Sequence, residues 1–486
     1  MPLHTTGTST SAHDAIEPAC PRDGETAGGE TAGGATTSVA IVGAGCAGTL
    51  TALKLLRSGG RTLRVVLVER DGRFGPGVAY DTCDPRHRLN VVAERMSAFE
   101  DVPDHFRVWA ERRLGCRQAA AYLPRMHYGA YLRELLDDAA RAAPGRLERI
   151  AGEAIDVRPA SGGAVVALRD GRRIAADHVV LALGGLPPAP PVALPDDPRV
   201  VADPWAAGAP APAPPGATTL LVGSGLTAVD VALSACATDA RSRVVAISRG
   251  GCLPFDHLPG LRAPAPPPAP PGAAATVASL ERWLRCHVRD MEAAGYDWRD
   301  AVDGLRPLVP RLWRSLPHDE RRGFMRTRAR AWDLRRHRMA PEVAAEVRGL
   351  LAAGRLLVRP GRVVGVRARP ETVETLVVAG DGELRTLRTD RVVVCAGPGQ
   401  DVRRASSPLL RSLLDRGVAC ADPLALGLRA TPEGRLLAPD GRPHAALHLL
   451  GPLRRGELWE TTAVREIRAQ ADTIARAIGA VPAGRS

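Results

Sequence analysis

Two glycine-rich turns are the parts of this sequence best suited to chemistry. The first, GAGCAG at residues 43–48, has the spacing G-x-G-x-x-G, and the second, GSGLTA at residues 223–228, is the G-x-G-x-x-A variant. Each follows an apolar run and precedes a helical pattern. Glycines in such a turn permit a tight bend, close approach of a pyrophosphate and close packing of the helix on the strand. Backbone N–H groups at the start of the helix can then bind the pyrophosphate, so each turn predicts a dinucleotide site.

The charge at the end of the next strand distinguishes the two turns. Glu69 lies 21 residues after Gly48, where a carboxylate can accept hydrogen bonds from a ribose 2′-hydroxyl. The equivalent position after the second turn is Ser248, 20 residues past Ala228, and Arg249 follows it. An arginine attracts a 2′-phosphate that a carboxylate would repel. We therefore expect FAD at the first turn and NADPH at the second, with ordinary surface charges at Glu69 and Arg249 as the alternative.

Short apolar runs bounded by turn residues alternate with helical patterns along the chain. Continuous apolar runs of this length are typical of parallel strands that are covered on both faces. Helical patterns occur, for instance, at 104–114, 127–141 and 277–295. The sequence therefore predicts an α/β fold with two Rossmann-like dinucleotide-binding domains and right-handed crossovers. The predicted strands lie within 38–43, 64–69, 178–185, 218–223, 243–248, 354–359 and 390–397.

Composition limits the class of protein and its partners. A chain of 486 residues is too long for one typical core, so two or three domains are expected. The formal net charge of +12 favours anionic partners. The arginines are scattered and no basic tract is interleaved with aromatic residues, which favours nucleotide cofactors and small acidic substrates over nucleic acid.

Cysteine usage and hydropathy indicate the compartment. None of the nine cysteines forms a C-x-x-C pair, so neither a redox-active dithiol nor a structural metal site is predicted. The odd count and irregular spacing are typical of a reducing cytoplasm. The sequence contains no apolar run of about 18 residues and no signal-peptide core, so we expect a cytoplasmic protein without a membrane partner.

The chain resembles the bacterial FAD/NAD(P)-binding proteins related to flavin-dependent N-hydroxylating and Baeyer–Villiger-type monooxygenases. Beside the glycine turns, the resemblance rests on the segments 74–109, 124–135, 332–344 and 451–471. It implies a discontinuous FAD domain at 38–215 and 385–480. An NADPH domain at 216–384, with a proline-rich loop and substrate-side helices, would be inserted between these parts. Residues 1–37, rich in Thr, Gly and Ala, are expected to form a disordered tail.

The resemblance also implies residues close to the flavin. They come from the 74–109 segment and from the stretch Gly451 to Thr462, where Leu458 and Trp459 would wall the ring system. Arg125 and Tyr128 would lie close to the cofactor cleft. The alternatives are a core position for Met96, turn capping for Asn90 and simple packing for Tyr80. The predicted cofactor-binding residues are Gly43, Gly45, Gly48, Glu69, Arg70, Gly77, Tyr80, Asn90, Met96, Ser97, Arg125, Gly223, Gly225, Thr227, Ser248, Arg249, Gly451, Leu458 and Trp459.

An arginine-rich block, RTRARAWDLRRHRMAP at residues 326–341, stands out in the inserted region. It can be a cationic patch for a substrate carboxylate or for the NADPH phosphates, because guanidinium forks match both groups. The alternative is a solvated helix face. His337 is the candidate proton donor or relay and Arg336 its neighbouring catalytic candidate.

The function that these features favour is oxygen activation by an FAD and NADPH pair. The resemblance implies a C4a-hydroperoxyflavin that transfers one oxygen atom to a small anionic substrate in a dry pocket. The preferred reaction is N-oxygenation of an amino acid, of the aspartate-to-nitrosuccinate type, in secondary metabolism. Alternatives are hydroxylation of a heterocycle such as urate, electron transfer to an iron–sulfur protein, and a non-catalytic redox sensor. Thiol reduction is disfavoured because the sequence lacks a suitable cysteine pair.

Overall fold

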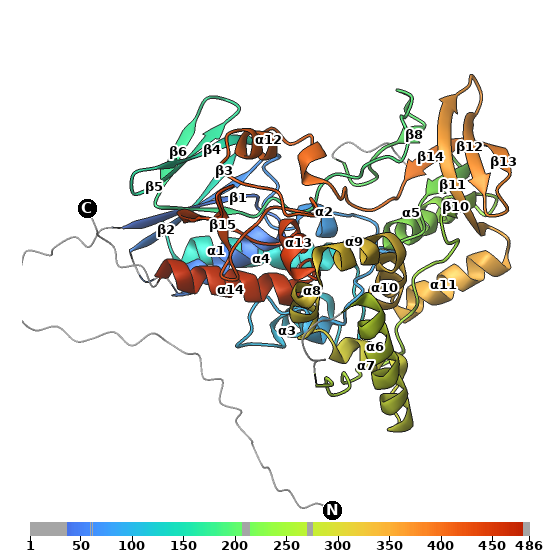
Figure 1. Ribbon diagram of the computed structural model, residues 1–486, viewed down its shortest axis with the longest axis horizontal. Helices are drawn as coiled ribbons and strands as arrows, with labels where there is room; N and C mark the ends of the chain where they lie inside the picture. Colours follow the sequence, from blue (N-terminus) through green and yellow to red (C-terminus); the bar gives the residue numbers. More distant parts are fainter. Residues whose placement is uncertain (1–35, 59, 61, 207–213, 270–275, 480–486) are drawn as a thin grey trace, which may run out of the picture. The chain divides into compact units, whose positions relative to one another are not determined.

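The computed structural model of the protein describes residues 36–58, 60, 62–206, 214–269 and 276–479. Most of the predicted disordered tail, 1–37, lies outside these residues, and Thr37 already begins the first strand. Parts of both proline-rich segments also lie outside them. Two main sheets organise the described chain (Figure 1).

Six strands form the first sheet, in the order β15-β16-β7-β1-β2-β3. All neighbouring pairs are parallel except β15 with β16. Val39 of β1 lies opposite Val65 of β2 on one side and His178 of β7 on the other. The predicted parallel α/β architecture is therefore confirmed for this part of the chain. The strands are β1 (Thr37–Val42), β2 (Leu63–Glu69), β3 (Leu147–Ala151), β7 (His178–Leu181), β15 (Arg435–Leu437) and β16 (Pro443–Leu449).

Apolar layers cover both faces of this sheet, which explains the uninterrupted apolar runs. Since successive side chains of a strand point to opposite faces, Val39 and Ile41 enter one buried cluster while Ala40 and Val42 enter another. In Figure 1, α14 lies beside α1, in agreement with their extensive packing. The helices of the first layer are α1 (Cys46–Ser58), α4 (Arg125–Ala142) and α14 (Val464–Gly479). The second layer consists of β4 (Ala154–Ala160), β5 (Gly163–Leu168), β6 (Arg173–Ala176) and α12 (Pro408–Asp415).

Seven strands form the second sheet, in the order β13-β12-β11-β10-β9-β14-β8. The strands from β8 to β11 in this order are parallel, whereas β11, β12 and β13 are antiparallel. Helices α5 (Leu226–Ala237) and α11 (Pro341–Ala352) cover one face. The strands are β8 (Val200–Val201), β9 (Thr218–Val222), β10 (Arg243–Ser248), β11 (Leu356–Ala368), β12 (Val373–Ala379), β13 (Leu384–Thr389) and β14 (Arg391–Val394).

One predicted boundary differs from the observed sheets. The expected return to the FAD domain at residue 385 falls inside β13, and β14 lies between β8 and β9, with Val392 opposite Leu220. Residues 385–394 therefore belong to the second sheet. The short run RVVV has the same apolar character as the strands of both sheets, so its sequence does not indicate which sheet it joins.

Five helices between the last proline-rich segment and α11 form a cluster of their own. Trp313 belongs to its buried core, which also includes Leu426 and Trp459 from the C-terminal part of the chain. These helices are α6 (Val277–Ala293), α7 (Trp298–Gly304), α8 (Val309–Ser315), α9 (His318–Thr327) and α10 (Ala329–Arg336). The remaining short helices are α2 (Gly77–Tyr80), α3 (His105–Leu114) and α13 (Arg455–Leu458), with 3₁₀ turns η1 (Ala93–Arg95), η2 (Val402–Arg404) and η3 (Pro452–Arg454). Among the helices of the described ranges, none has both the length and the apolar character needed to cross a bilayer.

Candidate cofactor sites and active site

The first glycine turn joins β1 to α1 in a form that excludes larger residues. Gly43 has a φ of +98°, and a Cβ on it would overlap the carbonyl oxygen of Ala182. A Cβ on Gly48 would overlap the carbonyl oxygen of Gly43, and one on Gly45 would lie 3.2 Å from the Cα of Gly77. The turn thus has the tight bend and the close helix packing that its spacing predicts.

Backbone donors are available at the start of α1. Among the described residues, nothing accepts a hydrogen bond from the N–H groups of Cys46 and Ala47. Glu69, at the end of β2, accepts hydrogen bonds from the N–H of Ala44 at 2.7 Å and of Arg70 at 3.0 Å. The carboxylate therefore lies at the turn, where the predicted ribose contact requires it. The Arg70 side chain is directed to Asp71 at 3.3 Å.

The second glycine turn repeats this geometry between β9 and α5. Gly223 has a φ of +122°, and a Cβ on it would overlap the carbonyl oxygen of Cys395. Within the described chain, the N–H groups of Gly225 and Thr227 have no acceptor. Ser248 occupies the place that Glu69 has in the first site, and its hydroxyl lies 2.8 Å from the hydroxyl of Ser224.

Two guanidinium groups lie at the second turn. Arg330 of α10 donates to the Ser224 hydroxyl at 3.1 Å and to its carbonyl oxygen at 3.2 Å. Arg249 is exposed, and its side chain has no polar partner among the residues described. Partial burial lowers the pKa of Arg330, and the charge of Arg249 contributes to the same effect. From the sequence, Arg330 is only one arginine of a long block. Its contact with the turn could not be predicted, because 106 residues separate it from Ser224.

The predicted flavin-side residues of the 74–109 segment divide into two groups. The rings of Tyr80 and Tyr128 lie 4.7 Å apart, and Tyr80 lies on α2, next to the first turn through Gly77. Met96 is buried in the apolar cluster, and the Ser97 hydroxyl donates to carbonyl oxygens of its own loop. These contacts favour structural roles for Met96 and Ser97.

The C-terminal stretch returns to the first glycine turn. A Cβ on Gly451 would lie 3.7 Å from the Cβ of Ala47, in the first turn of α1. Gln470 of α14 accepts from the Gly451 N–H at 3.0 Å and donates to the Thr461 hydroxyl at 2.8 Å. Thr461 in turn donates to the Gly451 carbonyl oxygen at 2.9 Å. Gln470, which the sequence does not single out, thus closes the stretch 451–461 into a loop beside α1.

Trp459 lies in a strained turn of this loop. Its φ of +60° and ψ of −61°, with a 2.7 Å hydrogen bond from the Glu460 N–H to the Leu458 carbonyl oxygen, define a γ-turn that is rare for residues other than glycine. The indole is buried against Trp313, with ring centroids 4.8 Å apart. The guanidinium of Arg455 lies 4.3 Å from the indole centroid on another side. These contacts hold the strained conformation in place.

Arg125 connects the two nucleotide-binding regions. It begins α4, and its guanidinium pairs with Asp230 of α5 at 2.9 Å while lying 5.0 Å from the Trp205 ring. Burial raises the pKa of Asp230 to about 7, although the charge of Arg125 opposes this shift. Arg125 is therefore bound within the protein, at the seam between the first and second glycine-turn regions.

The arginine-rich block is largely bound within the protein as well. Arg336 pairs with Glu460 at 3.0 Å and with Asp303 at 3.4 Å. Arg338 is fully buried and also pairs with Asp303. Neither guanidinium is available to a substrate without breaking these pairs. The geometry of Arg336 and Arg338 therefore favours a role in holding neighbouring segments in position over a catalytic role.

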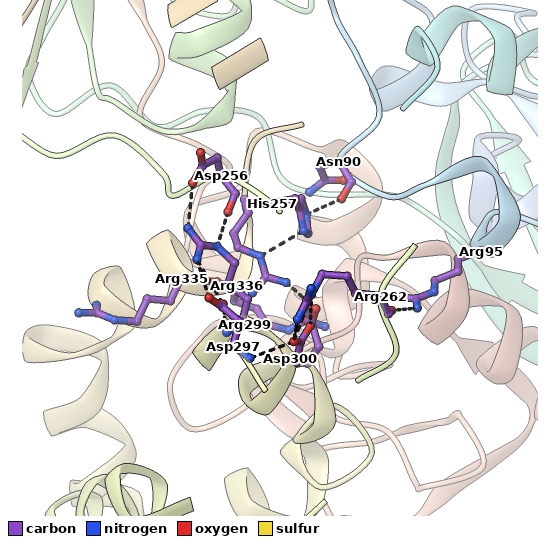
Figure 2. Close-up of polar contacts among 12 residues, drawn as sticks. Asn90, Arg95, Asp256, His257, Arg262, Asp297, Arg299, Asp300, Arg335 and Arg336 are labelled. Atoms are coloured by element: carbon purple, nitrogen blue, oxygen red, sulfur yellow. Dashed lines mark hydrogen bonds and ion pairs between the residues drawn. The ribbon is translucent and has the colours of Figure 1, made fainter. Parts of the chain in front are cut away.

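His257 links this block to the flavin-side segment. Its Nε2 donates to the carbonyl oxygen of Asn90 at 3.0 Å, and its Nδ1 accepts from the Nε of Arg338 at 3.3 Å. Burial lowers the pKa of His257 to about 4, which keeps the ring neutral. Figure 2 shows dashed lines from His257 to Asn90 and from Arg262 to Asp300 in the same network. The backbone of Asn90, rather than a capping side chain, makes the contact that the structure records.

His337, the proposed proton relay, ends α10 with 44% of its side chain exposed. Its Nε2 lies 3.9 Å from a carboxylate oxygen of Asp333, one turn earlier. Desolvation lowers the pKa of His337 to about 4, and desolvation raises that of Asp333. His337 is therefore neutral near pH 7, which makes it a poor general acid there.

The two turns fit dinucleotides on geometry and differ in charge. Both leave no room for a Cβ at their first glycine, Gly43 or Gly223, and present N–H groups unpaired among the described residues at a helix start, as a bound pyrophosphate requires. The first turn is accompanied by the carboxylate of Glu69, and the second by the guanidinium groups of Arg249 and Arg330.

Comparison with known proteins agrees with this geometry. Residues 40–186 match the protein family described as FAD-NAD(P)-binding. No curated protein matches the sequence. The fold is similar to that of ornithine hydroxylase from Pseudomonas aeruginosa, with 17% identity and a TM-score of 0.59 over 91% of this chain and 99% of the other.

Two further solved structures share the fold. L-lysine 6-monooxygenase from Pseudomonas syringae has 16% identity and a TM-score of 0.58 over 91% of this chain and 99% of the other. Bacillithiol disulfide reductase from Staphylococcus aureus has 13% identity and a TM-score of 0.54 over 91% and 98%. The chain therefore shares the fold of these three enzymes, and its residues 40–186 match the FAD-NAD(P)-binding family.

Proposed function

We propose that the protein is an FAD-dependent, NADPH-consuming monooxygenase that oxygenates the nitrogen of a small anionic amino acid, with aspartate as the first candidate. The observation that carries the proposal is the difference between the two glycine turns. The carboxylate of Glu69 suits the free ribose hydroxyls of FAD. Arg249 and Arg330 suit the 2′-phosphate and pyrophosphate of NADPH.

FAD, when bound, supplies hydride acceptance from NADPH and activation of O₂. The overall reaction inserts one oxygen atom into an N–H bond, releases the other as water, and consumes one NADPH and one proton. The protein's own part is to bind both nucleotides, to position the amine and to keep water out of the site.

Helix α10 connects the two nucleotide sites and is the expected wall of the substrate space. Arg330, Asp333 and His337 are spaced by three and four residues, so they lie on one face of the helix. Arg330 lies on the second glycine turn, and the charge of Asp333 acts on Arg455 of the C-terminal stretch. That stretch begins at Gly451, beside the first turn.

The fold neighbours support an amino acid as substrate. Ornithine hydroxylase and L-lysine 6-monooxygenase, by their names, both act on amino acids, and each shares the fold over most of both chains. The anionic character of the proposed substrate is inferred from the positive charge of this chain, formally +12.

The structure offers little for the thiol chemistry that the name of the bacillithiol disulfide reductase neighbour suggests. Cys46 is the cysteine of the first glycine turn, and burial raises its pKa to about 12. A thiol with so high a pKa stays protonated and is a poor nucleophile.

The test is NADPH oxidation by the FAD-loaded protein with and without candidate substrates. L-Aspartate should accelerate NADPH oxidation, and mass spectrometry should find oxygen on the product nitrogen. Stimulation by urate with loss of its ultraviolet band would favour the heterocycle hydroxylase instead. If no amine or heterocycle accelerates NADPH oxidation while a ferredoxin is reduced, the monooxygenase proposal is wrong.

A further inference from the structure

We infer that Arg455 and Asp333 are the two charged ends of a substrate site, in which the guanidinium binds a carboxylate and the aspartate binds the amino group of the same molecule. The inference rests on the proposed function and extends it by assigning the substrate contacts. The proposed anion-binding residue is therefore Arg455, which the sequence does not single out, and not an arginine of the 326–341 block.

Arg455 is a guanidinium without a counter-ion. It is half-buried at the start of α13, and its side chain makes no hydrogen bond or ion pair with any residue described. Its one recorded contact is the stack on the indole of Trp459, at 4.3 Å. Stacking fixes the plane of the guanidinium and leaves its N–H donors free at the edge, which is the arrangement that binds a carboxylate bidentately.

Asp333, like Arg455, is a charged group that makes no hydrogen bond through its side chain with the residues described. About a third of its side chain remains exposed (31%), and its nearest basic partner is His337, at 3.9 Å. Its carboxylate oxygens accept no hydrogen bond from the described residues. Burial raises the pKa of Asp333, which is the effect expected of a carboxylate that lacks donors.

The two groups lie near each other without pairing. The charge of Asp333 acts on Arg455 and that of Arg455 on Asp333, yet the two side chains do not come within the 4.0 Å of an ion pair. A carboxylate and a guanidinium that lie near each other without pairing can be bridged by a zwitterion. An α-amino acid has the complementary pair of charges on adjacent carbon atoms.

Three neighbouring arginines are already bound. Arg336 and Arg338 pair with Glu460 and Asp303, as described above. Arg454, next to Arg455, donates to the carbonyl oxygen of Thr431 at 2.8 Å and is 2% exposed. Arg455 is thus a partly buried guanidinium near α10 and the C-terminal loop that can take a new anion without losing an old partner.

The neighbourhood of Arg455 suits an amino acid that is to be oxygenated. Trp459 below it belongs to the loop that Gln470 closes beside α1, so the site adjoins the proposed flavin position. Arg330 lies three residues before Asp333 on the same face of α10, and it donates a hydrogen bond to Ser224 of the second glycine turn. The site therefore lies between the two proposed nucleotides.

The experiment measures binding without turnover. Calorimetric titration of the FAD-loaded protein, saturated with NADP⁺, uses L-aspartate and succinate as probes, since succinate has the carboxylates but not the amino group. Arg455→Gln should weaken both probes by about 10- to 100-fold, the range of a lost charge-assisted interaction. Asp333→Asn should weaken L-aspartate similarly and leave succinate within about twofold. Arg455→Lys should bind both with intermediate affinity, because it keeps the charge and loses the fork.

Two controls separate recognition from folding. Arg326→Gln removes an exposed arginine of the 326–341 block and should change the affinity for neither L-aspartate nor succinate. The flavin content and the thermal unfolding temperature of Arg455→Gln, compared with wild type, show whether the variant folds and binds FAD.

The outcomes also separate this inference from the proposed function. Unchanged succinate affinity in Arg455→Gln, or failure of both probes to bind the wild-type protein, overturns the inference even if NADPH-dependent oxygenation occurs. Binding of the probes that depends on Arg455 and Asp333 supports it even if no oxygenated product forms, in which case the proposed reaction alone is wrong.

Discussion

Arg336 of α10 and Glu460 of the C-terminal loop form a buried ion pair in which the guanidinium Nε lies 3.0 and 3.1 Å from the two carboxylate oxygens. The side chains are only 10% and 9% exposed. Glu460 directly follows Trp459, whose γ-turn costs free energy and persists only where its surroundings fix it. The pair therefore joins the helical cluster to the loop beside the first glycine turn and holds the strained turn.

Glu460→Gln should destabilise the protein, because it leaves the guanidinium of Arg336 buried with only Asp303 as partner. Breaking a buried pair typically costs about 3–5 kcal/mol, and the remaining contact should place this change near the lower value. Urea unfolding measures the free energy. The matched control is Glu148→Gln, whose exposed pair with Arg64 should be worth less than about 1 kcal/mol. Equal losses in the two variants would contradict the structural role of the pair.

Gly48→Ala should abolish FAD binding. The new Cβ would overlap the carbonyl oxygen of Gly43, so α1 would have to move away from β1 and the N–H groups at its start would lose their position. The flavin content of the purified protein, from its absorbance, checks this. Gly349→Ala, in α11 with no atom within 4 Å of the new Cβ, should retain FAD and keep or slightly raise stability. A yellow, fully loaded Gly48→Ala protein would show that the turn does not bind the flavin.

Arg249→Ala and Arg330→Ala should affect the nicotinamide cofactors differently. Arg249, at the ribose position, should select the 2′-phosphate, so its loss should weaken NADPH by about 10- to 100-fold and leave NADH nearly unchanged. Arg330 lies on the turn itself, where the pyrophosphate is expected, so its loss should weaken both cofactors. Anaerobic flavin reduction at varied cofactor concentration gives both affinities.

The matched control for these variants is Arg243→Ala, at the opposite end of the same strand, β10. It should alter neither cofactor. If Arg249→Ala weakens NADH as much as NADPH, the assignment of the 2′-phosphate to Arg249 is wrong.

Asp230→Asn should change the pH dependence of stability. Burial raises the pKa of Asp230 to about 7 in the folded protein, against about 3.9 in the unfolded chain. The folded state then binds more protons between these values. The stability contribution of Asp230 is therefore full below about pH 4 and is lost as the pH rises through about 7. Asp230→Asn removes that loss, so its stability relative to wild type should increase between pH 5 and pH 8.

Thermal unfolding across this pH range checks the sign for Asp230. His87 faces the same seam, and burial lowers its pKa to about 4, which gives the opposite slope in both proteins. The comparison of Asp230→Asn with wild type therefore isolates the aspartate. A constant difference between the two proteins from pH 5 to pH 8 would contradict a titrating Asp230.

Local sequence signals predicted the nucleotide-binding turns well. The apolar runs, the glycine spacing and the residues that end β2 and β10 all act within about 30 residues of one another, so their geometry follows from strand–turn–helix stereochemistry. Glu69 and Ser248 both lie at their glycine turns, and their contacts with the two nucleotides stay predictions. The parallel sheets were predicted for the same reason.

Contacts between distant segments account for what the sequence did not reveal. Arg330 meets Ser224 across 106 residues, and Arg336 meets Glu460 across 124. Which arginines of the 326–341 block are ion-paired depends on carboxylates elsewhere in the chain, such as Glu281, Asp303 and Glu460, so the sequence left a cationic patch and a solvated helix face as alternatives. The sequence did not single out Arg455, because what distinguishes this arginine is the lack of a hydrogen-bonding or ionic partner among the described residues. Only the structure reveals that.

The most direct test of the proposed oxygenation follows the oxygen atom itself. The FAD-loaded protein is reduced anaerobically with NADPH and then mixed with ¹⁸O₂ and L-aspartate, and the product is analysed by mass spectrometry. The proposed function predicts ¹⁸O on the former amino nitrogen, in an amount that accounts for the NADPH consumed. Conversion of all the NADPH equivalents to hydrogen peroxide, with L-aspartate and the other amines recovered unchanged, would contradict it.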